Sequence, residues 1–329
     1  MTTILLLFLG TSLSAGLIVL ILIVLSPFLD KRYAAKWKYL IWIFLALRLL
    51  VPFSGADGRP AAEWLSRTGT QTAAGPEKAD PDITADGIGR AGRIIVELPA
   101  GMTTPMIPQS VLQSEESNTG ITLLDVAAFV WMAGSLIFIS VHVISYFHCK
   151  RQVMQKGRMV KDVHILRQVS ERKRELQIRR TIRVMTYAEA GSPMVIGFRK
   201  PVLVLPTEQY SAEELFFILK HEMIHLKRGD ICVKLLLVMA NAVHWFNPVI
   251  WIMRREAAVD MELSCDERVT QGLDDAVRKA YTETLLSVLQ KGFVRKTVLS
   301  TQFYGGTKIM KRRFKIYGSK TRRKTGFLF

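Results

Sequence analysis

Residues 4–26 contain no charged side chain, and this stretch constrains the fold of the 329-residue chain more than any other. At a rise of about 1.5 Å per residue, a helix of this length spans the roughly 30 Å hydrocarbon core of a bilayer. A signal peptide would have a shorter apolar run and a basic N-terminal flank, whereas the leading MTT has no basic residue. The stretch therefore predicts a transmembrane helix.

Two further apolar segments predict two more spans. Residues 1–53 then hold two spans, at 4–26 and 37–53, and residues 122–147 form the third. The loop between the second and third spans, 54–121, is rich in Gly, Pro, Thr, Ala and Asp, which is typical of a flexible segment.

The charges of the loops predict how these spans are oriented. Residues 31–38 are basic, the loop 54–121 has more acids than bases, and the chain after 148 again has a large excess of Lys and Arg. Basic loops stay in the cytoplasm. We therefore expect the N-terminus and the loop 54–121 outside the plasma membrane and everything after 148 in the cytoplasm.

The formal net charge of +17 raises the question of nucleic-acid binding. Proteins that bind single strands place base-stacking aromatic residues among their cations. The only aromatic residues in the basic runs 172–180 and 311–324 are Phe314 and Tyr317. We expect no direct contact with nucleic acid, and a position beside anionic lipid explains the second run better.

The cysteines predict a reducing compartment. Cys149, Cys232 and Cys265 are scattered and form no CxxC pair, so they do not indicate a disulfide framework. We interpret Cys265 as a small buried residue rather than a metal ligand.

The segment 148–294 predicts a domain that contains both helices and strands. A charged helix is expected near 160–177. Runs rich in β-branched residues and bounded by Gly or Pro predict three short strands, at 181–187, 194–198 and 201–206.

The sequence HEMIHLKRGD, residues 221–230, predicts a metal site. Ser211 and Glu214 form a capping-box pattern that starts a helix, which is expected to end at Gly229. On that helix His221 and His225 are four residues apart and project from one face, as two ligands of one Zn²⁺ would.

Glu222, next to His221, is rotated away from the two histidines. It is placed to take a proton from metal-bound water rather than to bind the metal. The motif alone leaves two interpretations open, a metal site or a polar patch on an ordinary helix.

A catalytic zinc site needs a third protein ligand. Residues 255–269 have a helical pattern and hold five acids that could supply it: Glu256, Asp260, Glu262, Asp266 and Glu267. Spacing does not choose between the pair Glu256 and Asp260 and the pair Glu262 and Asp266. A solvated acidic face is the alternative for all five.

The mostly apolar segment 231–253 separates the histidines from these acids. Pro248 breaks or kinks a helix there, so we predict a membrane-associated helical hairpin rather than a clean span. A full crossing would put the acids on the far side of the membrane from the histidines. We expect His244 to pack at the interface beside Trp245.

Several motifs, taken in order, resemble the BlaR/MecR-type bacterial antirepressor membrane zinc metallopeptidases. They are SPMVIGFRKPVLVLP (192–206), HEMIHLKRGD (221–230), HWFNPVIW (244–251), DMELSCDERV (260–269) and YGGTKIMKRRFKIYG (304–318). The resemblance covers about residues 1–50 and 120–320. It implies an α-helical multi-span membrane protein with a cytoplasmic α+β gluzincin-like (HExxH) zinc metalloprotease domain.

The resemblance also implies roles for single residues. His221, His225 and Glu262 would hold Zn²⁺, Glu222 would be the general base, and Asp266 would orient a ligand. An extended peptide substrate would lie along the edge strand formed by Met194, Val195, Ile196 and Gly197.

The family further implies signal transduction in the regulation of antibiotic resistance. A cytosolic repressor of the BlaI/MecI kind would be the substrate, the chain would cleave itself within 296–313, and a homodimer would be allowed. The segment 295–329 reads as a basic linker that leads to a truncated fourth span, and no SxxK acylation motif is present. We therefore expect no penicillin-binding sensor domain. The alternative function is a non-catalytic scaffold that signals by protein contact.

Overall fold

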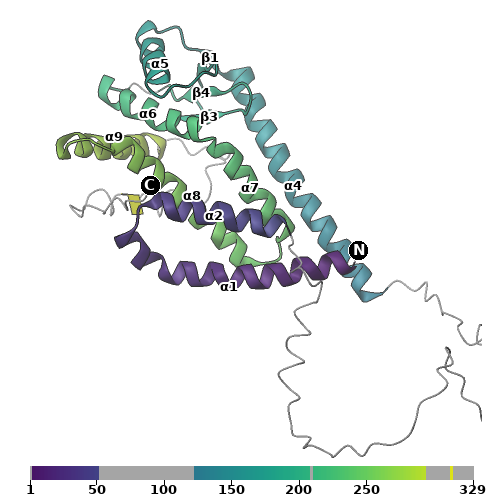
Figure 1. Ribbon diagram of the computed structural model, residues 1–329. Coiled ribbons are helices and arrows are strands. Elements are labelled where there is room, and N and C mark those ends of the chain that lie inside the picture. The colour runs from purple at the N-terminus through teal and green to yellow at the C-terminus, as the bar shows by residue number, and fades with distance from the viewer. Residues whose placement is uncertain (1, 52–121, 208–209, 294–311, 314–329) are drawn as a thin grey trace, which may run out of the picture. The chain divides into compact units, whose positions relative to one another are not determined.

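The computed structural model describes residues 2–51, 122–207, 210–293 and 312–313 (Figure 1). The helices in these ranges are α1 (Thr2–Arg32), α2 (Ala35–Leu50), α4 (Leu123–Lys156), α5 (Val163–Glu175), α6 (Ala212–Arg228), α7 (Asp230–Val243), α8 (Pro248–Thr270) and α9 (Asp275–Phe293). The strands are β1 (Arg158–Met159), β2 (Arg183–Thr186), β3 (Met194–Ile196) and β4 (Val202–Leu205). The described part of the chain is mostly helical, with one small sheet.

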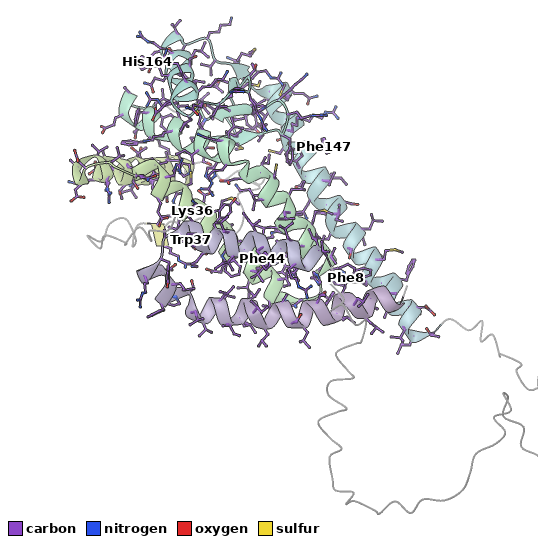
Figure 2. The ribbon with its side chains drawn as sticks, in the orientation of Figure 1. Phe8, Lys36, Trp37, Phe44, Phe147 and His164 are labelled. Atoms are coloured by element: carbon purple, nitrogen blue, oxygen red, sulfur yellow. The ribbon has the colours of Figure 1, made fainter. Side chains whose placement is uncertain are left out.

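Among the described helices, α1 and α4 are long and apolar enough to cross a membrane, over Leu5–Asp30 and Leu123–Lys156. Little of either is covered by the rest of the protein, since 22% of the most apolar window of α1 and 6% of that of α4 are buried. Phe147 on α4 is 59% exposed (Figure 2). An apolar surface of this extent suits contact with lipid. The first and third predicted spans are thus long apolar helices, and α4 continues beyond the predicted end at 147.

The second predicted span, 37–53, coincides with α2, which is shorter than expected. Its 16 residues form a helix of roughly 24 Å. One face is buried and includes Trp42 and Leu49, while Phe44 on the opposite face is 69% exposed (Figure 2). That α2 crosses the bilayer stays a prediction.

The helical core forms where α2 packs against α1, α7 and α8. Burying a large apolar side chain stabilises a fold by about 1.5–3 kcal/mol, so a cluster of this size ties the four helices together. Its fully buried members are Ala15, Val19, Trp42, Leu45, Ala46, Leu49, Leu237, Ala240, Ile250, Met253 and Ala257.

The segment 231–253 forms two helices joined by a tight turn, as the hairpin prediction required. Asn247 caps α8, since its side chain accepts a hydrogen bond from the Val249 amide at 2.9 Å, and Pro248 occupies the first turn of α8. Helix α8 packs against both α6 and α7, which brings the acidic residues back beside the histidines. His244 is fully buried with its Nε2 3.1 Å from the Leu49 carbonyl, so its ring packs inside the protein, and its position at the membrane interface stays a prediction.

Two tryptophans join α4 to the turn between α7 and α8. Trp131 donates its Nε1–H to the Val243 carbonyl at 2.8 Å, and Trp245 donates to the Trp131 carbonyl at 3.2 Å. Gly134 permits this approach, because a Cβ atom there would lie 2.5 Å from the Trp245 ring. The missing side chain on α4 thus makes room for the indole.

The sheet has the order β1-β2-β4-β3. Strand β2 runs parallel to β4, and the other two pairs are antiparallel. The strands β2, β3 and β4 fall inside the three predicted ranges. Leu203 and Leu205 of β4 pack against Ile218, Leu219 and Met223 of α6, so the sheet supports the helix that carries the histidines.

Candidate metal centre

Helix α6 begins and ends where the sequence predicts. The Ser211 side chain accepts a hydrogen bond from the Glu214 amide at 3.1 Å, and the Glu214 carboxylate accepts one from the Ser211 amide at 2.8 Å. Gly229, with φ of +70°, terminates the helix in the left-handed conformation. A capping interaction of this type contributes about 1 kcal/mol, and it fixes the helical frame on which the histidines lie.

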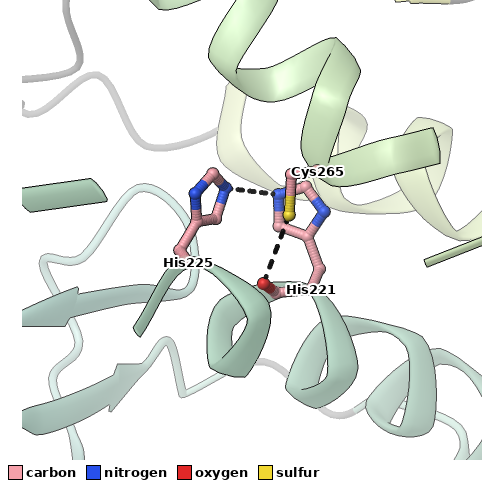
Figure 3. A group of neighbouring side chains, drawn as sticks. All are labelled: His221, His225 and Cys265. Carbon is pink, nitrogen blue, oxygen red and sulfur yellow. Dashed lines mark hydrogen bonds between the residues drawn. The ribbon is translucent and has the colours of Figure 1, made fainter. Parts of the chain in front are cut away.

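His221 and His225 point toward one another from adjacent turns of α6 (Figure 3). Their Nε2 atoms are 3.0 Å apart. The His225 Nδ1 lies 2.5 Å from the Asp230 carboxylate, and the His221 Nδ1 lies 3.0 Å from the Tyr281 hydroxyl oxygen. Each imidazole is therefore hydrogen-bonded through its Nδ1 atom, and its Nε2 atom faces the other ring.

The hydrogen bonds determine which ring nitrogen carries the proton. Tyr281 donates its only hydroxyl hydrogen to Asp266 at 2.6 Å, so the His221 Nδ1–H must be the donor to Tyr281. A carboxylate only accepts, so the His225 Nδ1–H donates to Asp230. The two Nε2 atoms then face each other at 3.0 Å, and either a proton on one of them or a metal ion between them satisfies the contact.

Glu262 of α8 is the acid that the fold brings to the two histidines. Its Oε2 lies 3.4 Å from His221 Nε2 and 3.6 Å from His225 Nε2. Burial raises the pKa of this carboxyl, but the neighbouring His225 and His221 hold it well below its usual range. A third acceptor atom therefore faces the same point.

The other acids of α8 have separate partners, and none forms part of a solvated face. Glu256 pairs with Arg312 at 2.7 Å. Asp260 is fully buried and accepts from the Trp42 indole at 2.7 Å, while Glu267 accepts from the Ala35 amide at 3.0 Å. Spacing alone left Glu256 and Glu262 as alternative third ligands. The packing of α8 places Glu262 at the histidines and Glu256 at Arg312.

Cys265 also belongs to this group. Its Sγ lies within 4.8 Å of ligand atoms of both His221 and His225, and it donates a hydrogen bond to the His221 carbonyl at 3.5 Å (Figure 3). The prediction that Cys265 is buried is confirmed, since its exposure is 0%. Burial does not exclude Cys265 as a metal ligand, because α8 brings this thiol as well as Glu262 close to the two histidines.

Glu222 lies beside the pair and is partly buried. Burial raises the pKa of its carboxyl, and the adjacent His221 and His225 lower it by a smaller amount. A carboxylate whose pKa is raised towards neutral is a better proton acceptor at neutral pH than an exposed one.

Asp266 is fully buried behind His221. It accepts from Tyr281 and lies 3.4 Å from His221 Nδ1. Arg313 donates to it through two nitrogens, at 2.6 and 2.7 Å. Asp266 therefore touches the back of a candidate ligand, where its predicted role requires it.

Strand β3 lies at the edge of the sheet and contacts α6. It contains Met194, Val195 and Ile196, and it pairs with β4 on one side. Gly197 ends it with φ of +94°, where a Cβ atom would lie 2.7 Å from the Lys200 carbonyl oxygen. Met194, Val195 and Ile196 thus form an edge strand, whereas Gly197 lies just beyond it, and the binding of a peptide there stays a prediction.

A family model for the BlaR1 peptidase M56 family matches residues 6–316. The chain belongs to the BlaR1 peptidase M56 family. Membership implies a membrane-associated metallopeptidase.

Two curated relatives show the extent of the likeness. The regulatory protein BlaR1 of Bacillus licheniformis is 24% identical over 312 residues, which are 93% of this chain and 49% of that protein. The methicillin resistance protein mecR1 of Staphylococcus aureus is 28% identical over 182 residues, which are 54% of this chain and 30% of that protein. The chain thus spans about half the length of BlaR1 and less of mecR1.

The donors at this M56 site fit a zinc ion. Two imidazole nitrogens, one carboxylate oxygen and one thiol sulfur are ligand types that Zn²⁺ accepts, and they come from His221, His225, Glu262 and Cys265. The two Nε2 atoms and the Glu262 oxygen face one point, where a metal ion would displace the proton shared by the rings. Three ligands of the four would leave a position open, as in catalytic zinc sites.

Sequence reasoning missed Asp230, Tyr281 and Arg313. Asp230 stands in the same motif as the histidines, so its spacing from His225 was a usable signal. Tyr281 reaches the site from α9, and nothing in its local sequence marks it. Arg313 lies in the motif 304–318 that the resemblance rests on, but that motif gave it no role.

Proposed function

We propose that this M56 family member is a zinc endopeptidase of a bacterial membrane. His221, His225 and Glu262 would bind the zinc. The proposal is carried by one observation, the convergence of the two histidine Nε2 atoms and the Glu262 carboxylate on a single point.

Zinc bound there would supply Lewis acidity, which lowers the pKa of water and polarises a peptide carbonyl. Glu222 would accept a proton from the attacking water and deliver it to the leaving amine. Asp266 and Asp230 would hold the two imidazoles in the tautomer that keeps Nε2 free. The role of Glu222 is supported by its position next to His221 and by its raised pKa.

The substrate would bind as an extended strand along β3. The edge strand is paired on one side by β4 and contacts α6, so an added peptide would lie beside the histidines. Met194, Val195 and Ile196 would provide the backbone groups, and Gly197 would end the pairing.

The biological role would be that of an antirepressor, with a cytosolic repressor as substrate and the protease domain in the cytoplasm. The names of the relatives, a regulatory protein and a methicillin resistance protein, support a signalling role. Cleavage of the chain itself within 296–313 is part of the proposal, and residues 296–311 of this segment lie outside the described residues. The bilayer would be a partner, and a homodimer is compatible with this function.

Metal analysis of the detergent-purified chain tests the proposal. We expect close to one zinc per chain in the wild type and in Glu267→Ala, a control acid on the same helix that does not face the histidines. Glu262→Ala should lose most of the zinc. A wild type that binds no zinc even after zinc loading would refute the enzyme and favour a scaffold. Loss of zinc in Cys265→Ala but not in Glu262→Ala would transfer the third-ligand role to the thiol.

A further inference from the structure

Arg313 contacts both acids of the metal centre. It donates to Asp266 through Nε and Nη2, at 2.7 and 2.6 Å, in the two-point geometry that suits a guanidinium and a carboxylate. Its Nη1 lies 3.7 Å from the Glu262 Oε2 that faces the histidines. Arg313 is only 8% exposed, so these ion pairs are little screened by solvent.

The contact continues from Asp266 to the metal-facing imidazole. Asp266 is 0% exposed, accepts from Tyr281, and Tyr281 in turn accepts from His221 Nδ1. A carboxylate buried to this degree is costly unless it is paired. Removing the guanidinium would therefore disturb Asp266, and through it the orientation of His221.

Arg312, the preceding residue, makes its contacts elsewhere. Its Nη2 lies 2.6 Å from Asp30 and 3.0 Å from the Ser26 hydroxyl, both on α1, and its Nη1 lies 2.7 Å from Glu256 of α8. Asp30 is the last residue of the apolar part of α1 that could cross a membrane. Arg312 thus bridges the end of a candidate membrane span and the helix that carries Glu262.

A buried lysine strengthens the same junction. Lys38 of α2 donates to Ser26 at 2.7 Å, to Asp30 at 2.9 Å and to Asp260 of α8 at 3.1 Å. Asp260 is fully buried and Lys38 is 4% exposed. The end of α1 is therefore held against α8 by two cations, one from α2 and one from the segment that contains Arg312.

We propose that the Arg312–Arg313 pair couples the end of α1 to the metal centre, with Arg313 as a positioning residue for His221 and Glu262. Because the two arginines are adjacent, a shift of α1 that draws Asp30 away from α8 also displaces Arg313 from Asp266. The affinity of the centre for zinc then depends on the position of α1. The proposal rests on the zinc site proposed above.

Zinc affinity, measured by competition with a chelator on the full detergent-purified chain, tests the positioning role. Arg313→Gln should bind zinc about 10- to 100-fold more weakly, the usual effect of losing a partner behind a ligand. Arg313→Lys should fall between, because lysine keeps the charge but not the two-point geometry. The matched control is Arg167→Gln, which removes an arginine from an exposed pair with Glu171 on α5.

Tyr281→Phe gives a second variant in case Arg313→Gln does not fold. It removes only the hydroxyl between Asp266 and His221, and we expect a several-fold weaker zinc affinity with little change in thermal stability. Wild-type affinity in Arg313→Gln, or in Tyr281→Phe if that variant alone folds, would overturn the positioning role. A wild type without zinc would instead refute the proposed function itself.

The coupling to α1 has its own test. Asp30→Asn and Arg312→Gln change no residue near the histidines, yet each should weaken zinc binding by roughly 2- to 30-fold. The double variant should bind zinc no more weakly than the single variant with the lower affinity, because both substitutions break the same contact between Asp30 and Arg312. Unchanged affinity in Asp30→Asn and Arg312→Gln would show that α1 and the metal centre are independent, and fully additive losses would overturn Arg312 as the connection between them.

Discussion

The Oε2 atom of Glu262 lies 3.4 Å from the Nε2 atom of His221, although the two residues are on different helices and 41 positions apart. The contact depends on the turn at 244–247, which sends α8 back along α6. It defines the centre of the candidate metal site.

Glu222 should be required for cleavage and not for metal binding. We expect Glu222→Gln to keep wild-type zinc content and lose at least about 100-fold in the rate of self-cleavage, in line with loss of a general base. His225→Ala should lose both zinc and cleavage. Metal analysis and mass spectrometry of the chain would measure the two effects, and a Glu222→Gln variant that cleaves normally would remove the proposed base.

Cys265→Ser should keep the zinc, because Glu262 supplies the third ligand in our proposal. The thiol is fully buried beside the His221 carbonyl, so the exchange should lower stability by about 1 kcal/mol. Zinc content and thermal unfolding distinguish these effects. Loss of zinc from a folded Cys265→Ser protein would contradict the assignment of Glu262 alone.

Zinc binding should weaken as the pH falls. Burial lowers the pKa of His221, but Cys265 and Glu262 oppose this and raise it to about 10 in the metal-free protein. Zinc binds a neutral imidazole, so a proton must leave, and the dissociation constant should rise by up to about tenfold per pH unit for each proton displaced.

The metal-free protein should show the opposite trend. The raised pKa means that the contribution of His221 to stability is complete below the ordinary value of 6.5 and is lost as the pH rises through about 10. Chelator competition and thermal unfolding at several pH values would measure the two trends. Zinc affinity that does not change with pH would rule out displaced protons.

Gly134 should not tolerate a side chain. Gly134→Ala would place a Cβ atom 2.5 Å from the Trp245 ring and should destabilise the protein by about 1–3 kcal/mol. Gly10→Ala is the matched control, because it lies on α1 with nothing within 4 Å and should be neutral or stabilising. Thermal unfolding in detergent measures both, and equal behaviour of the two variants would disprove the contact between α4 and Trp245.

Local sequence was sufficient for the elements that carry the site. The capping residues Ser211 and Gly229 set the ends of α6, and the spacing of His221 and His225 put both rings on one face. These features depend on backbone geometry within a few residues, which is readable from the order of residues alone. The predicted end of α2 was too late, because apolar residues continue past the end of the helix at Leu50.

Tertiary structure decided which distant groups meet. Glu256 and Glu262 lie on one helix with similar chemistry, and only the packing of α8 on α6 shows that Glu262 faces the histidines. Tyr281 enters the site from α9 with no local pattern that marks it, and Arg313 stands in a motif that gave it no role. The sequence by itself therefore determined the apolar helices, the strands β2, β3 and β4 and the histidine pair, because these follow from periodicity and caps. The contact of Glu262 with the histidines, the place of the buried arginine and the link to α1 required the fold, because long-range contacts depend on how helices pack.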